Sequence, residues 1–219
     1  MADINHDGWN DIVATVCNTT EVFSNLAQRN GAVGSPFDLF LGGSDQVDVM
    51  DFDPNFGPDI VTTNGGLLVS INDGGGGFSS TTESNVIQVG GGFAVGSFSG
   101  GAPQLAVETR NTLALLSVDP STGLATLLSQ SSLDTQGQRA VAADLNGDGF
   151  PDVVTFSNNT LGISINHGNG SFAASVDLPV GPGPFVQMIA AGDLNGDGAP
   201  DILVMFGNGP WVPYLNSCP

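Results

Sequence analysis

The sequence of 219 residues contains no lysine and only three arginines, against 22 aspartate and glutamate residues. Binding to a phosphate backbone or to an anionic membrane surface depends on cationic side chains. The near absence of cations therefore excludes nucleic acid as a partner, and we also expect no insertion into a membrane. Histidine is scarce as well, because His6 and His167 are the only two.

Recognisable catalytic motifs are also missing. The sequence has no Gly-x-Ser-x-Gly nucleophile elbow, no His-Glu-x-x-His zinc motif and no Gly-x-x-x-x-Gly-Lys phosphate loop. We expect both histidines to be turn residues rather than general bases. Carboxylates are plentiful, but a carboxylate that coordinates a metal stays ionised and is unavailable for proton transfer. The sequence thus nominates no catalytic residue and favours a binding protein over an enzyme.

Stretches with helical periodicity are absent too, whereas glycine is abundant, with 32 residues. Apolar residues make up 40% of the chain, which is enough for a sizeable core, and they occur in short runs separated by Gly and Asn turns. These features predict an all-β fold. We expect the 13 phenylalanines to belong to its core.

What the sequence does have is an acidic, glycine-rich loop at residues 144–152, Asp-Leu-Asn-Gly-Asp-Gly-Phe-Pro-Asp. It places oxygen-bearing side chains at loop positions 1, 3, 5 and 9, and a hard cation such as Ca²⁺ takes six to eight oxygens at ~2.3–2.6 Å. An EF-hand closes with Glu at position 12 between two helices, whereas this loop closes at position 9 and enters a β-rich segment. The loop therefore predicts a calcium site of another type.

The loop recurs along the chain. Further copies start at Asp3, Asp51 and Asp193, and the four loops together hold 12 of the 22 acidic residues. A fifth copy, at residues 97–105, is one residue shorter and has lost every carboxylate, so we expect no ion there. We predict about four calcium ions. Each loop would also supply one backbone carbonyl, that of Trp9, Gly57, Phe150 or Ala199. The predicted ligands are Asp3, Asn5, Asp7, Trp9, Asp11, Asp51, Asp53, Asn55, Gly57, Asp59, Asp144, Asn146, Asp148, Phe150, Asp152, Asp193, Asn195, Asp197, Ala199 and Asp201.

The spacing of the loops predicts the architecture. Their starts, at residues 3, 51, 97, 144 and 193, are 48, 46, 47 and 49 residues apart. A period of this length filled with short strands is typical of a β-propeller of four-stranded antiparallel blades, here one domain over residues 1–219. In the second copy we expect strands at 47–50, 59–63, 67–72 and 86–89, with the polar segment 79–85 as a connection. In the fourth copy the last strand is expected at 173–180.

The repeated pattern Asp-x-Asn-Gly-Asp-Gly-x-Pro-Asp, followed by an apolar strand, resembles FG-GAP repeats, also called VCBS repeats. The segments Gly92-Phe93-Ala94 and Gly101-Ala102-Pro103 fit the same family, and the resemblance spans nearly the whole chain. It implies an integrin-like propeller, usually of seven blades, with calcium between the first and second strands of its blades. Five loop copies leave three alternatives: a five-bladed ring with two incomplete blades, a fragment of a larger ring, or an oligomer that completes itself.

The resemblance also implies a function. Relatives are secreted or cell-surface proteins, so we expect an extracellular binding or adhesion module, lectin-like or integrin-like, with a carbohydrate or protein ligand. Extracellular calcium would fill loops with the ~10⁻⁴–10⁻³ M affinity of extracellular modules. The alternative is a secreted hydrolase or polysaccharide lyase, or an accessory domain of one, built on the same propeller.

The remaining predictions concern the aromatic and cysteine residues. Trp9, Trp211 and Tyr214 are the only tryptophans and tyrosine, and aromatic rings that stack on sugars make them the candidate ligand-binding residues. Packing of Trp211 and Tyr214 between the last and first blades is the alternative. A disulfide between Cys17 and Cys218 would close a long loop and stabilise a closed ring by on the order of 5 kcal/mol. The alternative is two buried free thiols.

Overall fold

A computed structural model describes residues 2–16, 19–23, 37–38, 46–54, 56–63, 66–84, 87–133, 137–181 and 185–217. The predicted disulfide partners Cys17 and Cys218 and the predicted ligand Asn55 lie outside these residues. The chain forms two compact units, residues 1–88 with 118–126, and residues 89–117 with 127–219. In the described ranges, no helix is long and apolar enough to cross a membrane.

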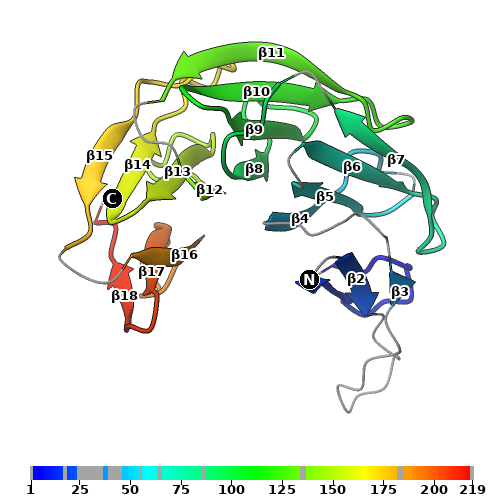
Figure 1. The fold of residues 1–219 in the computed structure, drawn as a ribbon, viewed down its shortest axis with the longest axis horizontal. Helices are drawn as coiled ribbons and strands as arrows, with labels where there is room; N and C mark the ends of the chain where they lie inside the picture. The colour runs from blue at the N-terminus through cyan, green and yellow to red at the C-terminus, as the bar shows by residue number, and fades with distance from the viewer. Residues whose placement is uncertain are drawn as a thin grey trace. The chain divides into compact units, whose positions relative to one another are not determined.

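The first unit contains two antiparallel sheets, each made of strands that are consecutive in the sequence (Figure 1). Ile4 and Ile60 form a buried apolar cluster in this unit, with Val13, Val47 and Val49 packed against it. The strands of the first sheet are β1 (Ile12–Val16), β2 (Thr19–Phe23) and β3 (Phe37–Asp38), and those of the second are β4 (Gln46–Met50), β5 (Asp59–Thr63), β6 (Leu67–Asn72) and β7 (Phe78–Ser84).

Three further sheets follow, again with consecutive antiparallel strands. The first of them contains β8 (Phe93–Gly96), β9 (Gln104–Glu108), β10 (Thr112–Val118) and β11 (Ala125–Ser132). The next contains β12 (Arg139–Ala143), β13 (Asp152–Ser157), β14 (Thr160–Ser164) and β15 (Val176–Pro179). The last contains β16 (Val186–Gly192), β17 (Asp201–Phe206) and β18 (Trp211–Tyr214).

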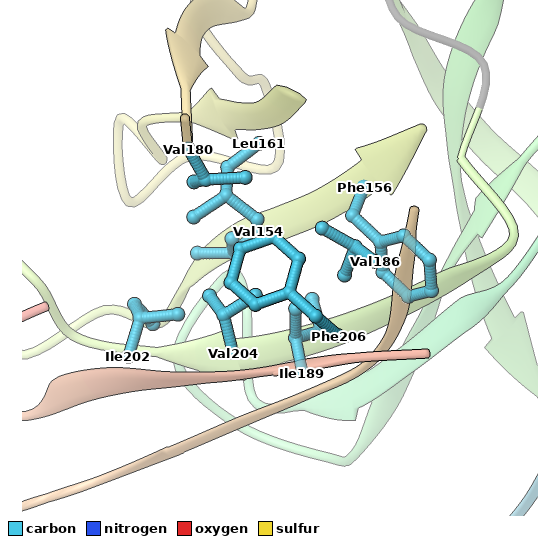
Figure 2. Close-up of a cluster of buried hydrophobic side chains, with 9 residues drawn as sticks. All are labelled: Val154, Phe156, Leu161, Val180, Val186, Ile189, Ile202, Val204 and Phe206. Atoms are coloured by element: carbon cyan, nitrogen blue, oxygen red, sulfur yellow. The ribbon is translucent and has the colours of Figure 1, made fainter. Parts of the chain in front are cut away.

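Neighbouring sheets in the second unit pack through apolar side chains. Figure 2 shows the cluster between the sheet β12–β15 and the sheet β16–β18, in which Val154 and Phe156 meet Ile202, Val204 and Phe206. A second cluster joins the sheets β8–β11 and β12–β15. Each fully buried side chain of this size contributes about 1.5–3 kcal/mol. The hydrophobic faces between sheets are therefore the main source of stability of this unit.

The predicted fold class is confirmed. The structure is all-β, and each sheet has the up-and-down antiparallel order of a propeller blade, with a candidate loop between its first two strands in the sheets that begin with β4, β8, β12 and β16. Strands expected at 59–63 and 67–72 are β5 and β6. The expected strand at 173–180 is present in a shorter form, β15.

Two sequence predictions are wrong. The fourth strand of the second copy is β7, Phe78–Ser84, and residues 87–89 of the expected strand 86–89 form no strand, while residue 86 lies outside the described residues. The Ser and Thr residues of β7 suit an outer strand that pairs on one edge with β6. Where the structure describes their burial, phenylalanines are not all in the core, since Phe56 is 47% exposed and Phe185 is 62% exposed. Their rings lie against Gly74 and Gly207, where the missing side chains leave room for them.

Candidate calcium loops and adjoining clefts

The loop at 144–152 is folded around its first residue. Asp144 Oδ1 accepts hydrogen bonds from the backbone N–H of Gly147 and Asp148 at 2.8 and 3.1 Å, and its Oδ2 accepts one from Gly149 at 2.8 Å. Gly147 and Gly149 have φ of 75° and 89°, which an L side chain rarely adopts. The sequence therefore needs glycine at both positions for the chain to wrap around this carboxylate.

Side-chain oxygens of loop positions 1 and 3 converge. The N–H of Asp148 donates to both Asp144 Oδ1 and Asn146 Oδ1, at 3.1 and 3.0 Å. In the first loop, the N–H of Asp7 donates in the same way to Asp3 Oδ1 and Asn5 Oδ1, both at 3.0 Å. Carboxylate and carboxamide oxygens that meet at one point are the donors a hard cation prefers.

The last loop repeats this geometry. Asp193 Oδ1 accepts from Gly196 N–H at 2.6 Å and its Oδ2 accepts from Gly198 N–H at 3.0 Å. These backbone donors lower the pKa of Asp193 below its usual value, because they stabilise the charged form. Asn195 Oδ1 accepts from Asp197 N–H at 2.8 Å. The loops that start at Asp3, Asp144 and Asp193 thus share one conformation.

The second loop, which starts at Asp51, shows a different feature. Among the described residues, Asp51 Oδ1 is buried and has no hydrogen-bond partner. An unpaired buried carboxylate oxygen is costly unless a cation or a donor compensates it. The oxygen therefore fits a bound cation. In the part of the chain that the structure describes, no group of three or more His, Cys, Asp or Glu side chains could hold a metal ion by itself, so any ion site must also use carboxamide and carbonyl oxygens.

The aspartate at loop position 9 has a structural task beside its predicted role as a ligand. Asp152 is fully buried, and its Oδ2 accepts from Leu145 N–H at 3.0 Å while its Oδ1 accepts from Asn166 N–H at 2.7 Å. Asp59 makes the equivalent bonds with Phe52 and Asn72, both at 2.8 Å. This carboxylate joins the start of its loop to the end of the third strand.

Burial raises the pKa of both carboxyls. Removal of water is the largest cause, and it raises the pKa of Asp59 to about 6, while the N–H donors of Asn72 and Phe52 act in the opposite direction. The negative charges of Asp51 and Asp53 raise it further. The pKa of Asp152 is raised by the same causes, with Asp148 and Asp144 as the nearby charges. A cation in the loop would offset this repulsion.

Sequence reasoning missed three asparagines that tie neighbouring sheets together. The side-chain amide of Asn72 donates to Ile4 O at 2.8 Å, that of Asn166 to Phe98 O at 2.7 Å, and that of Asn216 to Leu145 O at 2.8 Å. In each case the acceptor is the second residue of the loop in the preceding sheet. We name these bonds the asparagine straps. The signal was present in the sequence, because each Asn follows the position-9 Asp of its own repeat at a similar distance, 13 to 15 residues.

Two clefts lie beside the loops. The first, of about 330 Å³, is bordered by the loops that start at Asp144 and Asp193 and is lined by Asp144, Leu145, Asn146, Gly147, Asp197, Gly198, Ala199 and Pro200. The second, of about 290 Å³, is lined by Asp53, Phe56, Ile71, Asn72, Asp73, Pro120 and Ser121. Both clefts combine apolar surface with carboxylates of the candidate calcium loops. Phe56 provides an exposed aromatic ring beside the second.

The aromatic residues nominated from the sequence lie elsewhere. Trp9 and Trp211 are exposed and do not line either of these two clefts. Tyr214 is half-buried, packs against the cluster of Figure 2, and donates its hydroxyl hydrogen to Val180 O at 2.9 Å. The role of these three residues in ligand binding stays a prediction. Phe56 was missed because phenylalanine was expected to be in the core.

Comparison with known proteins agrees with the fold. Residues 129–204 match a family model described as FG-GAP-like repeat. The chain is similar to an Agrocybe aegerita lectin, solved in a study of specific recognition of non-reducing terminal N-acetylglucosamine, with a TM-score of 0.58 and 21% identity. The match covers 99% of this chain and 65% of the lectin.

A second solved structure, BBS1N in complex with ARL6DN, matches with a TM-score of 0.56 and 16% identity and covers 95% of this chain and 62% of that one. At such identities the likeness shows the fold alone, and the chain spans less than two thirds of the length of both structures. No curated protein sequence matches this chain at a significant level.

Proposed function

We propose that this chain, with its FG-GAP-like repeat in residues 129–204, is a secreted calcium-binding propeller module that binds carbohydrate in the clefts beside its loops. The observation that carries the proposal is the position of both clefts. Each is bordered by carboxylates of candidate calcium loops, Asp53 in one and Asp144 and Asp197 in the other. Ion binding and ligand binding would therefore use adjoining residues.

Calcium fits the loops chemically. The residues that would hold it are those at loop positions 1, 3 and 5. The side-chain oxygens of positions 1 and 3 converge, and in the second loop the buried oxygen of Asp51 lacks another partner among the described residues. A bound ion would supply positive charge that fixes the loop carboxylates in place. The likeness to a lectin with N-acetylglucosamine in its description supports this class of ligand, although that property belongs to the lectin.

The cleft beside Phe56 has the features of a sugar site. The exposed face of the Phe56 ring offers an apolar platform for the C–H face of a sugar ring. Asp53, Asp73 and Ser121 line the same cleft and present oxygens that accept hydrogen bonds from hydroxyl groups. A volume of about 290 Å³ lies near the lower end of the range of small-molecule sites, which suits a single sugar unit.

A glycan array in calcium buffer and in EDTA tests this proposal. We expect calcium-dependent binding to one group of glycans, and Phe56→Ala to weaken it about tenfold, the effect of losing one stacking contact. Phe185→Ala is the matched control, since this phenylalanine is also exposed but lines neither cleft. Unchanged binding by Phe56→Ala would contradict the site. Binding of no glycan, or turnover in a parallel screen of polysaccharides and esters, would contradict the function.

A further inference from the structure

The cleft beside Phe56 is bordered by three segments of the first unit. One is the second candidate loop, which carries Phe56, and another is the turn that follows β6, which begins with Asp73. The third is the turn 119–123, which is held on this sheet because the Thr122 carbonyl accepts a hydrogen bond from the hydroxyl of Thr82 in β7. The cleft is therefore a defined site within one compact unit.

Asn72 brings the only side-chain N–H donors among the described residues that line this cleft. Both of its amide hydrogens are already used, since Nδ2 donates to Ile4 O at 2.8 Å and to Pro58 O at 3.0 Å. Its Oδ1 accepts from Gly74 N–H at 2.9 Å. The amide of Asn72 thus holds the walls of the cleft together and offers no hydrogen to a ligand.

The hydroxyl hydrogen of Ser121 is used as well. Ser121 Oγ donates to Asp119 Oδ1 at 2.7 Å, and Ser121 N–H donates to the same oxygen at 3.0 Å. The hydroxyl of Ser121, followed by the other donors, lowers the pKa of Asp119, because these bonds stabilise the charged carboxylate. With its hydrogen directed to Asp119, the Ser121 hydroxyl presents only lone pairs to the cleft.

Asp73 supplies a carboxylate oxygen that the fold leaves available. Its Oδ1 accepts from Gly75 N–H at 2.9 Å and from Gly77 N–H at 3.1 Å, which closes the turn after β6. Among the hydrogen bonds of the described residues, none is donated to its Oδ2. The Asp73 side chain is exposed. This oxygen can therefore accept a hydrogen bond from a ligand without any loss to the turn.

The charge around the cleft has one sign. The described residues of the first unit include no lysine or arginine, and their one histidine, His6, does not line the cleft. Asp53 would share its charge with an ion in its own loop, whereas Asp73 belongs to no candidate loop. A negatively charged ligand would be repelled here, and a carbonyl oxygen would find no side-chain donor among the described lining residues.

We propose that this cleft selects a sugar with a free, protonated amino group, which donates to Asp73 and Ser121 while the sugar ring packs on Phe56. An ammonium group brings three donors and a positive charge, which suits a site that offers acceptors and carboxylates. The face of an aromatic ring attracts cations as well as C–H groups. This inference rests on the proposed carbohydrate function and specifies its ligand as an amino sugar, in place of an N-acetylated or acidic one.

Calorimetric titration with a glucosamine oligomer and with the same oligomer fully N-acetylated, in calcium buffer at neutral pH, tests the inference. We expect the wild-type protein to bind the amino oligomer at least tenfold more tightly. Asp73→Asn keeps an oxygen for the turn but replaces the available carboxylate oxygen by an N–H donor. It should weaken binding of the amino oligomer about tenfold without weakening that of the acetylated one.

The matched control is Asp177→Asn, which removes one negative charge from an exposed residue of β15 that lines neither cleft. It should bind both oligomers like the wild type, because the preference comes from the cleft and not from the net charge of the chain. An equal loss in Asp177→Asn and Asp73→Asn would overturn the inference. If circular dichroism shows that Asp73→Asn fails to fold, Ser121→Ala replaces it, since it removes another acceptor and should also weaken the amino oligomer more than the acetylated one.

Phe56→Ala separates this inference from the proposed function, because loss of the ring should weaken binding of both oligomers. Equal affinity of the wild type for the two oligomers, or an unchanged preference in Asp73→Asn, overturns the amino sugar as the ligand. The carbohydrate site stands in that case if Phe56→Ala still weakens binding. A lysine-rich peptide that displaces the amino oligomer with higher affinity overturns the inference in favour of a protein ligand, and a wild type that binds neither oligomer nor any other glycan overturns both proposals.

Discussion

The loops of the third and fourth repeats occupy the same place in neighbouring sheets but have different chemistry. In the third, Gln104 Oε1 accepts from the N–H and the hydroxyl of Ser99, both at 3.0 Å. In the fourth, Asp152 accepts from Leu145 N–H at 3.0 Å. A buried acceptor at the start of the second strand is present in both, whether charged or neutral. Both repeats keep this acceptor, whereas the third repeat has no carboxylate at loop positions 1 and 5. In the fourth repeat, the carboxylate at position 1 accepts backbone N–H groups of its own loop and is also a predicted ion ligand.

The same two repeats differ at the other end of the second strand. Counted from Gln104 and Asp152, Glu108 of β9 stands where β13 has the buried Phe156. Glu108 is fully buried, its Oε2 accepts from Gly137 N–H at 2.6 Å, and its Oε1 has no partner among the described residues. It fits because Gly91 and Gly137 lack side chains at that point. Burial raises the pKa of Glu108 to about 8, with the Gly137 N–H acting in the opposite direction.

The largest expected effect is the pH dependence caused by Glu108. Its pKa in the folded protein, about 8, lies above the ordinary 4.5, so the folded state binds the proton more tightly. The contribution of Glu108 to the free energy of unfolding is therefore fully present below pH 4.5 and is lost as the pH rises through 8. The free energy of unfolding should fall by up to ~1.4 kcal/mol per pH unit in this range. Glu108→Gln should flatten this slope in urea unfolding series recorded in EDTA.

The control for that series is Glu83→Gln, which changes an exposed carboxylate on the outer strand β7. It should leave the slope of the wild type unchanged. Equal pH slopes of the free energy of unfolding for Glu108→Gln and the wild type would show that Glu108 titrates like an ordinary carboxylate. That result would contradict the difference between β9 and β13 described above.

The second effect concerns the buried acceptor that the two loops share. Asp152→Ala leaves the buried N–H groups of Leu145 and Asn166 without their acceptor, which should cost about 2–4 kcal/mol in the free energy of unfolding. Asp148→Ala removes an exposed carboxylate of the same loop and, in EDTA, should cost less than about 1 kcal/mol. If both variants lose the same stability, the acceptor has no special role.

Much of this arrangement could be predicted from the sequence. The period of the loops and the apolar strands after them predict the order of strands, because the hydrophobic pattern and the turns are local features. The fourth strand of the second copy was misplaced, since an outer strand such as β7 needs little apolar surface and resembles a polar connection. The asparagines of the straps recur 13 to 15 residues after the position-9 Asp of their repeats, but this spacing does not identify their acceptors, which lie in the preceding sheet. The exposure of Phe56 depends on its packing against Gly74, which the sequence pattern does not specify.

The smallest expected effect is the stabilisation that calcium gives through a single loop. Calcium binding is also the most direct test of the account. At millimolar calcium, a loop with an affinity of ~10⁻⁴–10⁻³ M should stabilise the fold by about 1 kcal/mol. Asp148→Asn should remove the stabilisation that calcium gives through its own loop. Ser97→Ala, in the loop without carboxylates, should leave the calcium-dependent stabilisation unchanged.

Equilibrium dialysis of the wild-type protein against millimolar calcium, with melting curves recorded before and after chelation, measures this directly. We predict about four bound ions per chain, a melting temperature that falls on addition of EDTA, and the loss of one ion in Asp148→Asn. A chain that binds no calcium and melts at the same temperature in EDTA would contradict the account.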